Sequence, residues 1–433
     1  MERNLFKSLD KWKNKKNRKP LIIQGARQVG KTWIMREFGK RYYKNTIYIN
    51  FDNNEVMKKV FEIDFDISRI VSAIKIENGG DFDPEDTLII FDEIQEAPKA
   101  LSSLKYFYEN APQYAIIAAG SLLGVTLHEG TSFPVGKVDF LHLYPMDFRE
   151  FILALGEEEL ARILKDGNYE LVNAYSVRYI ELLKKYFYVG GMPEAVQTYI
   201  DTDDVFEVRQ IQKNLLKYYE EDFSKHAPKE VIPRIMMVWN SIPAQLAKEN
   251  RKFMYGSLRK GARAKEFEMA IQWLEDAGLI LKSYRISKPD IPLIAYMEMN
   301  SFKMFMLDVG LLGAKADLSA RVLLEGSAIF EEFKGALTEQ YVAEQLNASG
   351  RGLYYYSTEN SSGEIDFILQ QDLECVPIEV KASENLRAKS LRSFCDKYKP
   401  KKAIRTSMSN YRKEDWLTNV PLYMLIDYLD SED

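Results

Sequence analysis

The first third of the chain alternates between short apolar runs and longer amphipathic stretches. The apolar runs are LIIQG, TIYINF, TLIIF and YAIIAA, and segments of helical length separate them. Short buried runs joined by helices are typical of parallel strands. The pattern therefore predicts an α/β domain with a parallel sheet over residues 1–143.

From about residue 144 the apolar positions recur at helical spacing instead. Three amphipathic helices are predicted, at residues 146–155, 157–165 and 175–188. We interpret residues 144–229 as a helical lid or linker. Over residues 230–325, two helices are followed by Gly278 and an alternating strand. This order indicates a segment like a winged helix.

The last part of the chain changes character again after residue 326. The predicted helix FEEFKGALTEQYVAEQL is followed by short strands at residues 353–356, 364–369 and 376–380 and by another helix. The pattern predicts a small, separate α/β domain over residues 326–433. A chain of 433 residues is too long for one hydrophobic core, so several domains are expected.

The first apolar run leads directly into GARQVGKT, which satisfies the spacing G-x-x-x-x-G-K-[ST] between a strand and a helix. Glycines let the backbone wrap so that its N–H groups face a polyanion, and the following helix adds a positive dipole end. Lys31 would bridge the β- and γ-phosphates, and the Thr32 hydroxyl would bind Mg²⁺. The predicted nucleotide-binding residues are Gly25, Ala26, Arg27, Gln28, Val29, Gly30, Lys31 and Thr32.

The third apolar run ends in the acidic pair Asp92 and Glu93. The carboxyl ends of parallel strands form the ligand crevice of an α/β sheet. Asp92 is suited to hold magnesium, and Glu93 to orient and polarise an attacking water, so we expect hydrolysis. Ser121 follows the next strand, where it is either a sensor of the γ-phosphate or an ordinary strand-end cap.

These stretches resemble the AAA-type bacterial and archaeal ATPases that carry a C-terminal domain of unknown function. Matching segments span most of the chain: GARQVGKT, IIFDEIQ, AAGS, LYPMDFREF, YFYVGGMPEAV, FMLDVGLL and GALTEQYVAEQL. The resemblance implies an ATPase core, a helical lid, a winged helix and a nuclease-like end, and it implies ATP as the nucleotide. These proteins often carry Gly-Arg before the Leu-x-Pro stretch, where this chain has Gly136-Lys137, so no arginine finger is assigned.

A group of acidic residues marks the C-terminal domain. Glu339 lies on a predicted helix, Asp366 in GEIDFIL, and Glu379 two residues before Lys381 on a strand. Side chains two apart on a strand share a face, and paired carboxylates beside a lysine can bind Mg²⁺ or Mn²⁺ and attack a phosphodiester. The spacing resembles the PD-(D/E)XK nuclease fold. Three interpretations stay open: a competent metal site, a structural or binding relic, and a coincidental surface cluster.

Composition limits the remaining classes. The net charge of −5 argues against coating nucleic acid by bulk charge, so any contact with DNA must be local. With only two cysteines, the chain is expected in a reducing compartment. The three histidines are scattered along the sequence, which argues against a zinc site. No apolar run is long enough for a membrane helix, and we expect a cytoplasmic protein.

Two hypotheses follow. In the first, Mg²⁺-dependent ATP hydrolysis controls a C-terminal nuclease-like module that cleaves or binds DNA, with a homo-oligomer as one candidate active form. In the second, the chain is an ATP-dependent switch or scaffold that acts on protein partners, and its nuclease-like domain is inactive. Stimulation of ATP turnover by DNA would distinguish the two.

Overall fold

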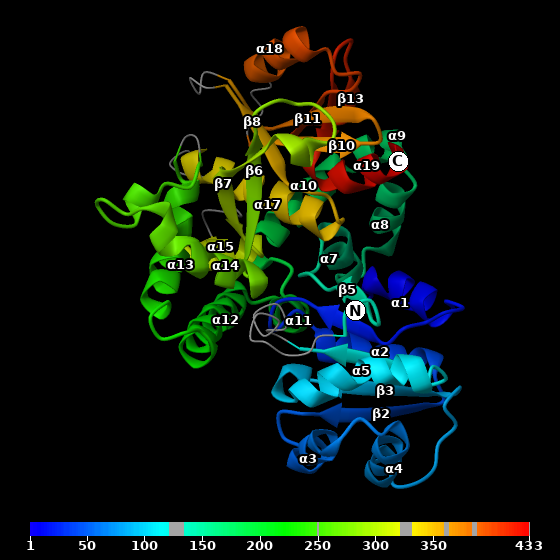
Figure 1. Ribbon diagram of the computed structural model, residues 1–433. Coiled ribbons are helices and arrows are strands. Elements are labelled where there is room, and N and C mark those ends of the chain that lie inside the picture. The colour runs from blue at the N-terminus through cyan, green and yellow to red at the C-terminus, as the bar shows by residue number, and fades with distance from the viewer. Residues whose placement is uncertain (121–133, 249–250, 321–330, 359–362, 383–387, 433) are drawn as a thin grey trace. The chain divides into compact units, whose positions relative to one another are not determined.

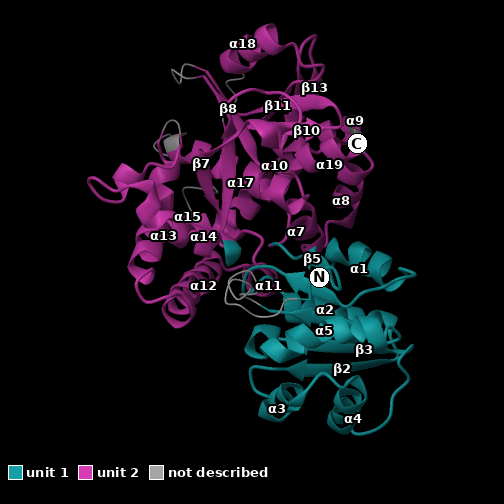
Figure 2. Cartoon of the chain, in the orientation of Figure 1, with its two compact units in different colours: residues 1–144, 276–278 teal, residues 145–275, 279–433 magenta. Residues whose placement is uncertain are grey.

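The computed structural model describes residues 1–120, 134–248, 251–320, 331–358, 363–382 and 388–432 (Figure 1). The chain divides into two compact units (Figure 2). Unit 1 holds residues 1–144 and 276–278, and unit 2 holds residues 145–275 and 279–433. Within the described parts of the chain, no helix is both long and apolar enough to cross a membrane.

Unit 1 is built around one five-stranded sheet. Its strands have the order β2-β3-β4-β1-β5, and every pair is parallel. The strands are β1 (Leu21–Gln24), β2 (Asn45–Asn50), β3 (Thr87–Asp92), β4 (Ala115–Ala119) and β5 (Asp139–His142). The helices are α1 (Leu5–Lys13), α2 (Lys31–Tyr42), α3 (Glu55–Ile63), α4 (Ile67–Glu77) and α5 (Pro98–Asn110). The predicted α/β class with a parallel sheet is confirmed.

The core of unit 1 explains why β3 is a fixed support. Every residue of β3 is buried. Phe91 meets Phe51 and Phe61 edge to face, with ring centroids 5.6 Å apart in both pairs. Edge-to-face aromatic packing adds to the stability from buried apolar area. The carboxyl end of β3, where Asp92 lies, is therefore held by a closely packed core.

Unit 2 begins with a helical segment. Its helices are α7 (Phe148–Ala154), α8 (Glu158–Lys165), α9 (Tyr169–Ala174), α10 (Ser176–Val189), α11 (Pro193–Thr202), α12 (Val205–His226), α13 (Ile232–Leu246), α14 (Ala264–Asp276) and α15 (Val309–Lys315). The three helices predicted from residue 146 onward correspond to α7, α8 and α10. Figure 1 shows the long helix α12 beside α13, and the two helices contact one another.

The rest of unit 2 contains two sheets. One has the order β7-β6-β8-β9 and the other β10-β11-β12-β14-β13. The strands are β6 (Ile280–Ile286), β7 (Met297–Met306), β8 (Tyr354–Ser357), β9 (Glu364–Ile365), β10 (Phe367–Gln371), β11 (Glu374–Val380), β12 (Ile404–Ser407), β13 (Arg412–Lys413) and β14 (Thr418–Pro421). The remaining helices are α17 (Glu331–Ala348), α18 (Lys389–Tyr398) and α19 (Leu425–Glu432).

The strand pairing bears on the predicted winged helix. Strands β6 and β7 form an antiparallel pair after α13 and α14, as a wing would. However, β6 also pairs in parallel with β8, so this hairpin is half of a four-stranded sheet that continues beyond residue 326. The winged helix and the division into four domains remain predictions.

Three of the motifs that carry the resemblance meet inside unit 2. The buried Asp308 carboxylate accepts hydrogen bonds from the N–H groups of Gly191, at 2.6 Å, and Leu311, at 2.8 Å. The Met146 N–H donates to the Gly191 carbonyl, and a Cβ at Gly191 would lie 2.0 Å from the Met146 carbonyl oxygen. Only glycine fits so close to another backbone segment. These motif residues therefore fix the packing of unit 2.

Candidate functional site

The loop between β1 and α2 has the conformation that its glycines allow. Gly25 has a φ of 148°, and a Cβ there would lie 2.2 Å from the Leu143 carbonyl oxygen. Gly30 has a φ of 95° and directly precedes the first residue of α2. Both positions favour glycine, because L side chains rarely adopt these angles. The loop thus ends at a helix N-terminus, where free N–H groups bind anions.

Lys31 is held inside this loop. Its Nζ donates to the Gly25 carbonyl at 2.8 Å and to the Ala26 carbonyl at 2.7 Å. Burial lowers the pKa of Lys31 to about 8, while Glu93 and Asp92 act in the opposite direction. A polyphosphate would supply the negative charge that this buried ammonium lacks, and would favour its charged form.

Two hydroxyl groups converge on Asp92. The Thr32 Oγ1 donates to Asp92 Oδ2 at 2.6 Å, and the Tyr48 Oη donates to the same oxygen at 2.8 Å. Asp92 is buried, and the Glu93 N–H donates to its other oxygen, Oδ1, at 3.1 Å. The two predicted metal-binding side chains, Thr32 and Asp92, are therefore adjacent. Hard oxygen donors of this kind suit Mg²⁺, so the residues present fit that ion.

Glu93 has an unusual backbone conformation. Its φ of 49° and ψ of 45° are left-handed, which is uncommon for a residue other than glycine. Its Oε2 accepts a hydrogen bond from Gln95 Nε2 at 2.6 Å. Strained backbone often persists where a side chain must be aimed for function. The chain thus leaves the course of β3 at Glu93, directly after the residue that would hold the metal.

Ser121, the predicted γ-phosphate sensor or strand-end cap, lies outside the described residues. Lys137, which stands where similar proteins often have arginine, forms an ion pair with Glu109 at 3.0 Å.

Comparison with known families matches three segments of the chain. Residues 17–152 match the family described as AAA domain, which includes the loop, Asp92 and Glu93. The N-terminal part of the chain is therefore similar to AAA domains. Residues 180–322 match a domain of unknown function, DUF8612, and residues 334–425 match another, DUF4143. Comparison with curated proteins finds no match.

Among solved structures, similarity is distant. The Walker-type ATPase of Pyrococcus abyssi is 16% identical with a TM-score of 0.44, over 72% of this chain and 94% of that one. The ORC1 protein of Aeropyrum pernix in complex with DNA is 13% identical, with a TM-score of 0.27 over 72% and 90% of the two chains. Drosophila ORC bound to DNA is 14% identical, with a TM-score of 0.28 over 72% and 94%.

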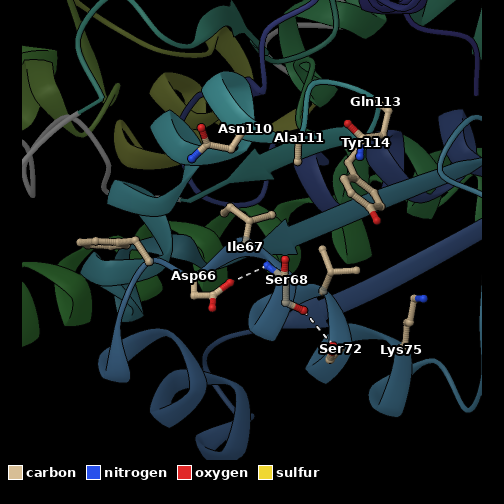
Figure 3. Close-up of a pocket in the computed structure, with 11 residues that line it drawn as sticks. Asp66, Ile67, Ser68, Ser72, Lys75, Asn110, Ala111, Gln113 and Tyr114 are labelled. Atoms are coloured by element: carbon tan, nitrogen blue, oxygen red, sulfur yellow. Dashed lines mark hydrogen bonds between the residues drawn. The ribbon is translucent and has the colours of Figure 1, made fainter.

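The AAA-type domain also has a pocket of about 530 Å³ away from the P-loop (Figure 3). Its lining includes Ser68, Ser72 and Lys75 of α4, together with Gln113 and Tyr114. Tyr114 precedes β4, whereas the P-loop follows β1, and the two strands are parallel. The pocket therefore lies at the opposite edge of the sheet from the P-loop and is not part of the nucleotide site.

The predicted acidic residues of the C-terminal domain lie in unit 2, where the chain's own cations contact them. Lys303 Nζ lies 2.6 Å from Glu339 Oε1, 2.6 Å from Glu364 Oε1 and 3.9 Å from Asp366 Oδ1. Arg251 forms an ion pair with the other oxygen of Glu339. Within the described residues, no group of three or more His, Cys, Asp or Glu side chains is arranged to hold a metal ion.

Glu379 and Lys381 pair with one another. Lys381 Nζ lies 2.7 Å from Glu379 Oε1, while Glu379 Oε2 is buried and has no hydrogen-bond partner among the described residues. The register of β10 and β11 pairs Phe367 with Ile378, so Asp366 is opposite Glu379. The Val380 N–H donates to Asp366 Oδ2 at 2.7 Å. The predicted strand over residues 364–369 is broken at Asp366, because its two halves belong to different sheets.

Several residues of both clusters were not predicted from the sequence. At the P-loop these are Tyr48 and Gln95, and in unit 2 they are Arg251, Lys303 and Glu364. Lys303 has a visible signal, since a lone charge in the apolar run SFKMFM of a strand indicates a buried ion pair. Tyr48 has none, because a tyrosine in an alternating strand is ordinary.

Proposed function

We propose that the AAA-type domain binds ATP with Mg²⁺ and hydrolyses it. The observation that carries this proposal is the convergence of Thr32 and Asp92, 2.6 Å apart, beside the buried ammonium of Lys31. This geometry supplies a cation for the phosphates and two adjacent oxygen ligands for a metal. A site that bound only an anion, without a metal, would need neither the Thr32 hydroxyl nor the buried Asp92 carboxylate.

The residues would divide the work as follows. The loop N–H groups and Lys31 bind the phosphates and neutralise charge on the γ-phosphate. Thr32 and Asp92 would hold Mg²⁺, which when bound supplies further positive charge to the phosphate oxygens. Glu93 orients the attacking water and accepts its proton, and attack is in line with the leaving phosphate.

Thermal unfolding tests the binding step. Mg·ATP should raise the unfolding midpoint of the wild type, because a ligand that binds only the folded state stabilises it. Lys31→Ala should lose this shift, and Lys40→Ala, an exposed lysine at the end of the same helix, should keep it. An unchanged shift in Lys31→Ala would reject the proposed role of the loop.

For unit 2, the contacts favour the switch over the nuclease. Metal-dependent cleavage needs carboxylate oxygens that are available to a metal, and both oxygens of Glu339 are engaged by Lys303 and Arg251. We therefore propose that ATP turnover controls the binding of unit 2 to a partner. We propose DNA as that partner because Lys389 and Lys397 both lie on α18, where two ammonium groups suit a phosphate backbone. Turnover that rises when DNA is added would support DNA, whereas turnover indifferent to DNA would favour a protein partner.

Two further expectations remain proposals. Assembly into a homo-oligomer would supply the arginine that the position of Lys137 does not. A cytoplasmic location accords with the free thiols of Cys375 and Cys395.

A further inference from the structure

Lys303 is the centre of the acidic cluster in unit 2. It comes from the middle of β7, and its side chain is fully buried. The carboxylates around it come from three other places in the fold: Glu339 on α17, Glu364 on β9, and Asp366 at the break between β9 and β10. A buried ammonium is tolerated only where carboxylates surround it closely.

A second cation completes the coordination of Glu339. Arg251 pairs with Glu339 Oε2, while Lys303 pairs with Glu339 Oε1, and the Glu339 side chain is only 1% exposed. Neither oxygen of this carboxylate is thus available without breaking an ion pair. If Mg²⁺ took the place of both cations on Glu339, the Lys303 ammonium would still be buried nearby. It would then be repelled by the metal ion instead of being attracted by the carboxylate.

The charges within the cluster are nearly balanced. Three carboxylates face two cations. Burial and the neighbouring Glu339 raise the pKa of Asp366, although Lys303 and Arg251 oppose this shift. The attraction that such a cluster would exert on a divalent ion is already satisfied from within the chain.

We propose that Lys303 takes the place of a divalent metal in this cluster, so that Glu339, Glu364 and Asp366 hold unit 2 together and bind no metal. The residues present do not fit Mg²⁺ or Mn²⁺, contrary to the expected site of Glu339, Asp366 and Glu379. Glu379 Oε2 is buried and has no hydrogen-bond partner in the described part of the chain, but one oxygen atom is too few ligands to hold a metal ion. This inference does not depend on ATP hydrolysis in unit 1.

Removal of the lysine charge should convert the cluster into a metal site. Lys303→Met keeps an unbranched side chain of similar length and leaves three carboxylates around an apolar group. The full chain, stripped with EDTA and free of nucleotide, is titrated with Mn²⁺ while the resonance of free Mn²⁺ is followed by electron paramagnetic resonance. Lys303→Met should bind one more Mn²⁺ than the wild type, and Mn²⁺ should raise its unfolding midpoint.

Matched variants identify where the ion binds. Lys282→Met removes a different half-buried lysine, which lies on the neighbouring strand β6 and pairs with Glu275 of α14, and this variant should gain no Mn²⁺. Glu339→Gln leaves the P-loop intact, so a loss of Mn²⁺ in that variant reports on the cluster alone. If Lys303→Met does not fold, the wild type still decides. Wild-type Mn²⁺ binding that Glu339→Gln abolishes would overturn the proposal, and binding that Glu339→Gln leaves unchanged would uphold it.

Discussion

At the scale of single residues, the chain uses buried charges that are matched by specific partners. In unit 1, Asp92 receives hydroxyl groups from Thr32 and Tyr48. In unit 2, Lys303 forms ion pairs with Glu339 and Glu364. The first arrangement pairs a carboxylate with neutral donors and leaves its negative charge for a metal. The second pairs charges with charges, and its attraction for an external ion is small.

The contribution of a neutral hydroxyl donor to the position of Asp92 can be tested at Tyr48. Burial and the hydrogen bond to Asp92 raise the pKa of Tyr48 to about 12, so the hydroxyl keeps its proton and remains a donor. Tyr48→Phe removes one of the two hydroxyl donors that position Asp92. Hydrogen bonds to charged groups contribute about 1.5–3 kcal/mol, so ATP turnover should fall roughly tenfold or more.

The dependence of turnover on Mg²⁺ concentration separates positioning from general damage. Tyr48→Phe should need more Mg²⁺ for half-maximal turnover, while the thermal shift with nucleotide persists. Tyr42→Phe, on a more exposed tyrosine of α2, should leave both unchanged. A normal Mg²⁺ dependence in Tyr48→Phe would show that Tyr48 does not position Asp92.

At the scale of elements, sequence patterns identify the helices and strands, but not all of their partners. Each of the four apolar runs in the first third becomes a strand of the parallel sheet, within one or two residues of its expected bounds. The helices α7, α8 and α10 follow from their spacing in the same way. The pairing of β6 with β8 could not be predicted, because it joins residues far apart in the sequence.

Asp308 shows how an element boundary can depend on pH. It caps α15 and also accepts the Gly191 N–H, and burial raises its pKa to about 6 in spite of these hydrogen bonds. Glu344 and Tyr186 face the same region, and repulsion from Asp308 adds to the effect of burial in raising the pKa of Glu344. A carboxyl group with a raised pKa contributes stability that is complete below its unfolded pKa and is lost as pH rises through the folded value.

Asp308→Asn tests this contribution. The shift in the pKa of Asp308 from 3.8 to about 6 corresponds to about 3 kcal/mol of unfolding free energy. The wild type loses this stability between about pH 4 and pH 7, whereas the variant does not. The variant is less stable because one backbone N–H loses its acceptor, but the difference should narrow as pH rises. Urea unfolding across this range measures it, with the exposed Asp317→Asn as control. A difference that stays constant or widens would show that Asp308 does not titrate as described.

At the scale of the whole molecule, the chemistry of unit 1 could be predicted more fully than that of unit 2. The P-loop spacing is local and strict, so Gly25, Lys31 and Thr32 could be named from the sequence. The acidic group of unit 2 combines distant segments, and the sequence alone did not show that Lys303 and Arg251 would reach Glu339. The run SFKMFM indicates that Lys303 is buried in an ion pair, but no local sequence pattern identifies the distant residues that pair with it.

The two units therefore have different expected responses to ions. Under the proposed function, unit 1 binds ATP together with a divalent metal, and unit 2 should keep its structure in EDTA. The central claim concerns hydrolysis in unit 1, for which Glu93 is the proposed residue that activates water. Glu93 directly follows Asp92 in a left-handed turn, and its carboxylate accepts a hydrogen bond from Gln95.

Steady-state release of phosphate from ATP with Mg²⁺ tests this claim most directly, with wild type compared with Glu93→Gln. Glutamine keeps the size of glutamate and one acceptor oxygen, but it cannot accept a proton from water. The wild type should hydrolyse ATP, and Glu93→Gln should lose at least about a hundredfold in turnover while it keeps the thermal shift with Mg·ATP. Near-normal turnover in Glu93→Gln would contradict this account. So would the absence of ATP turnover in the wild type, both alone and with DNA added.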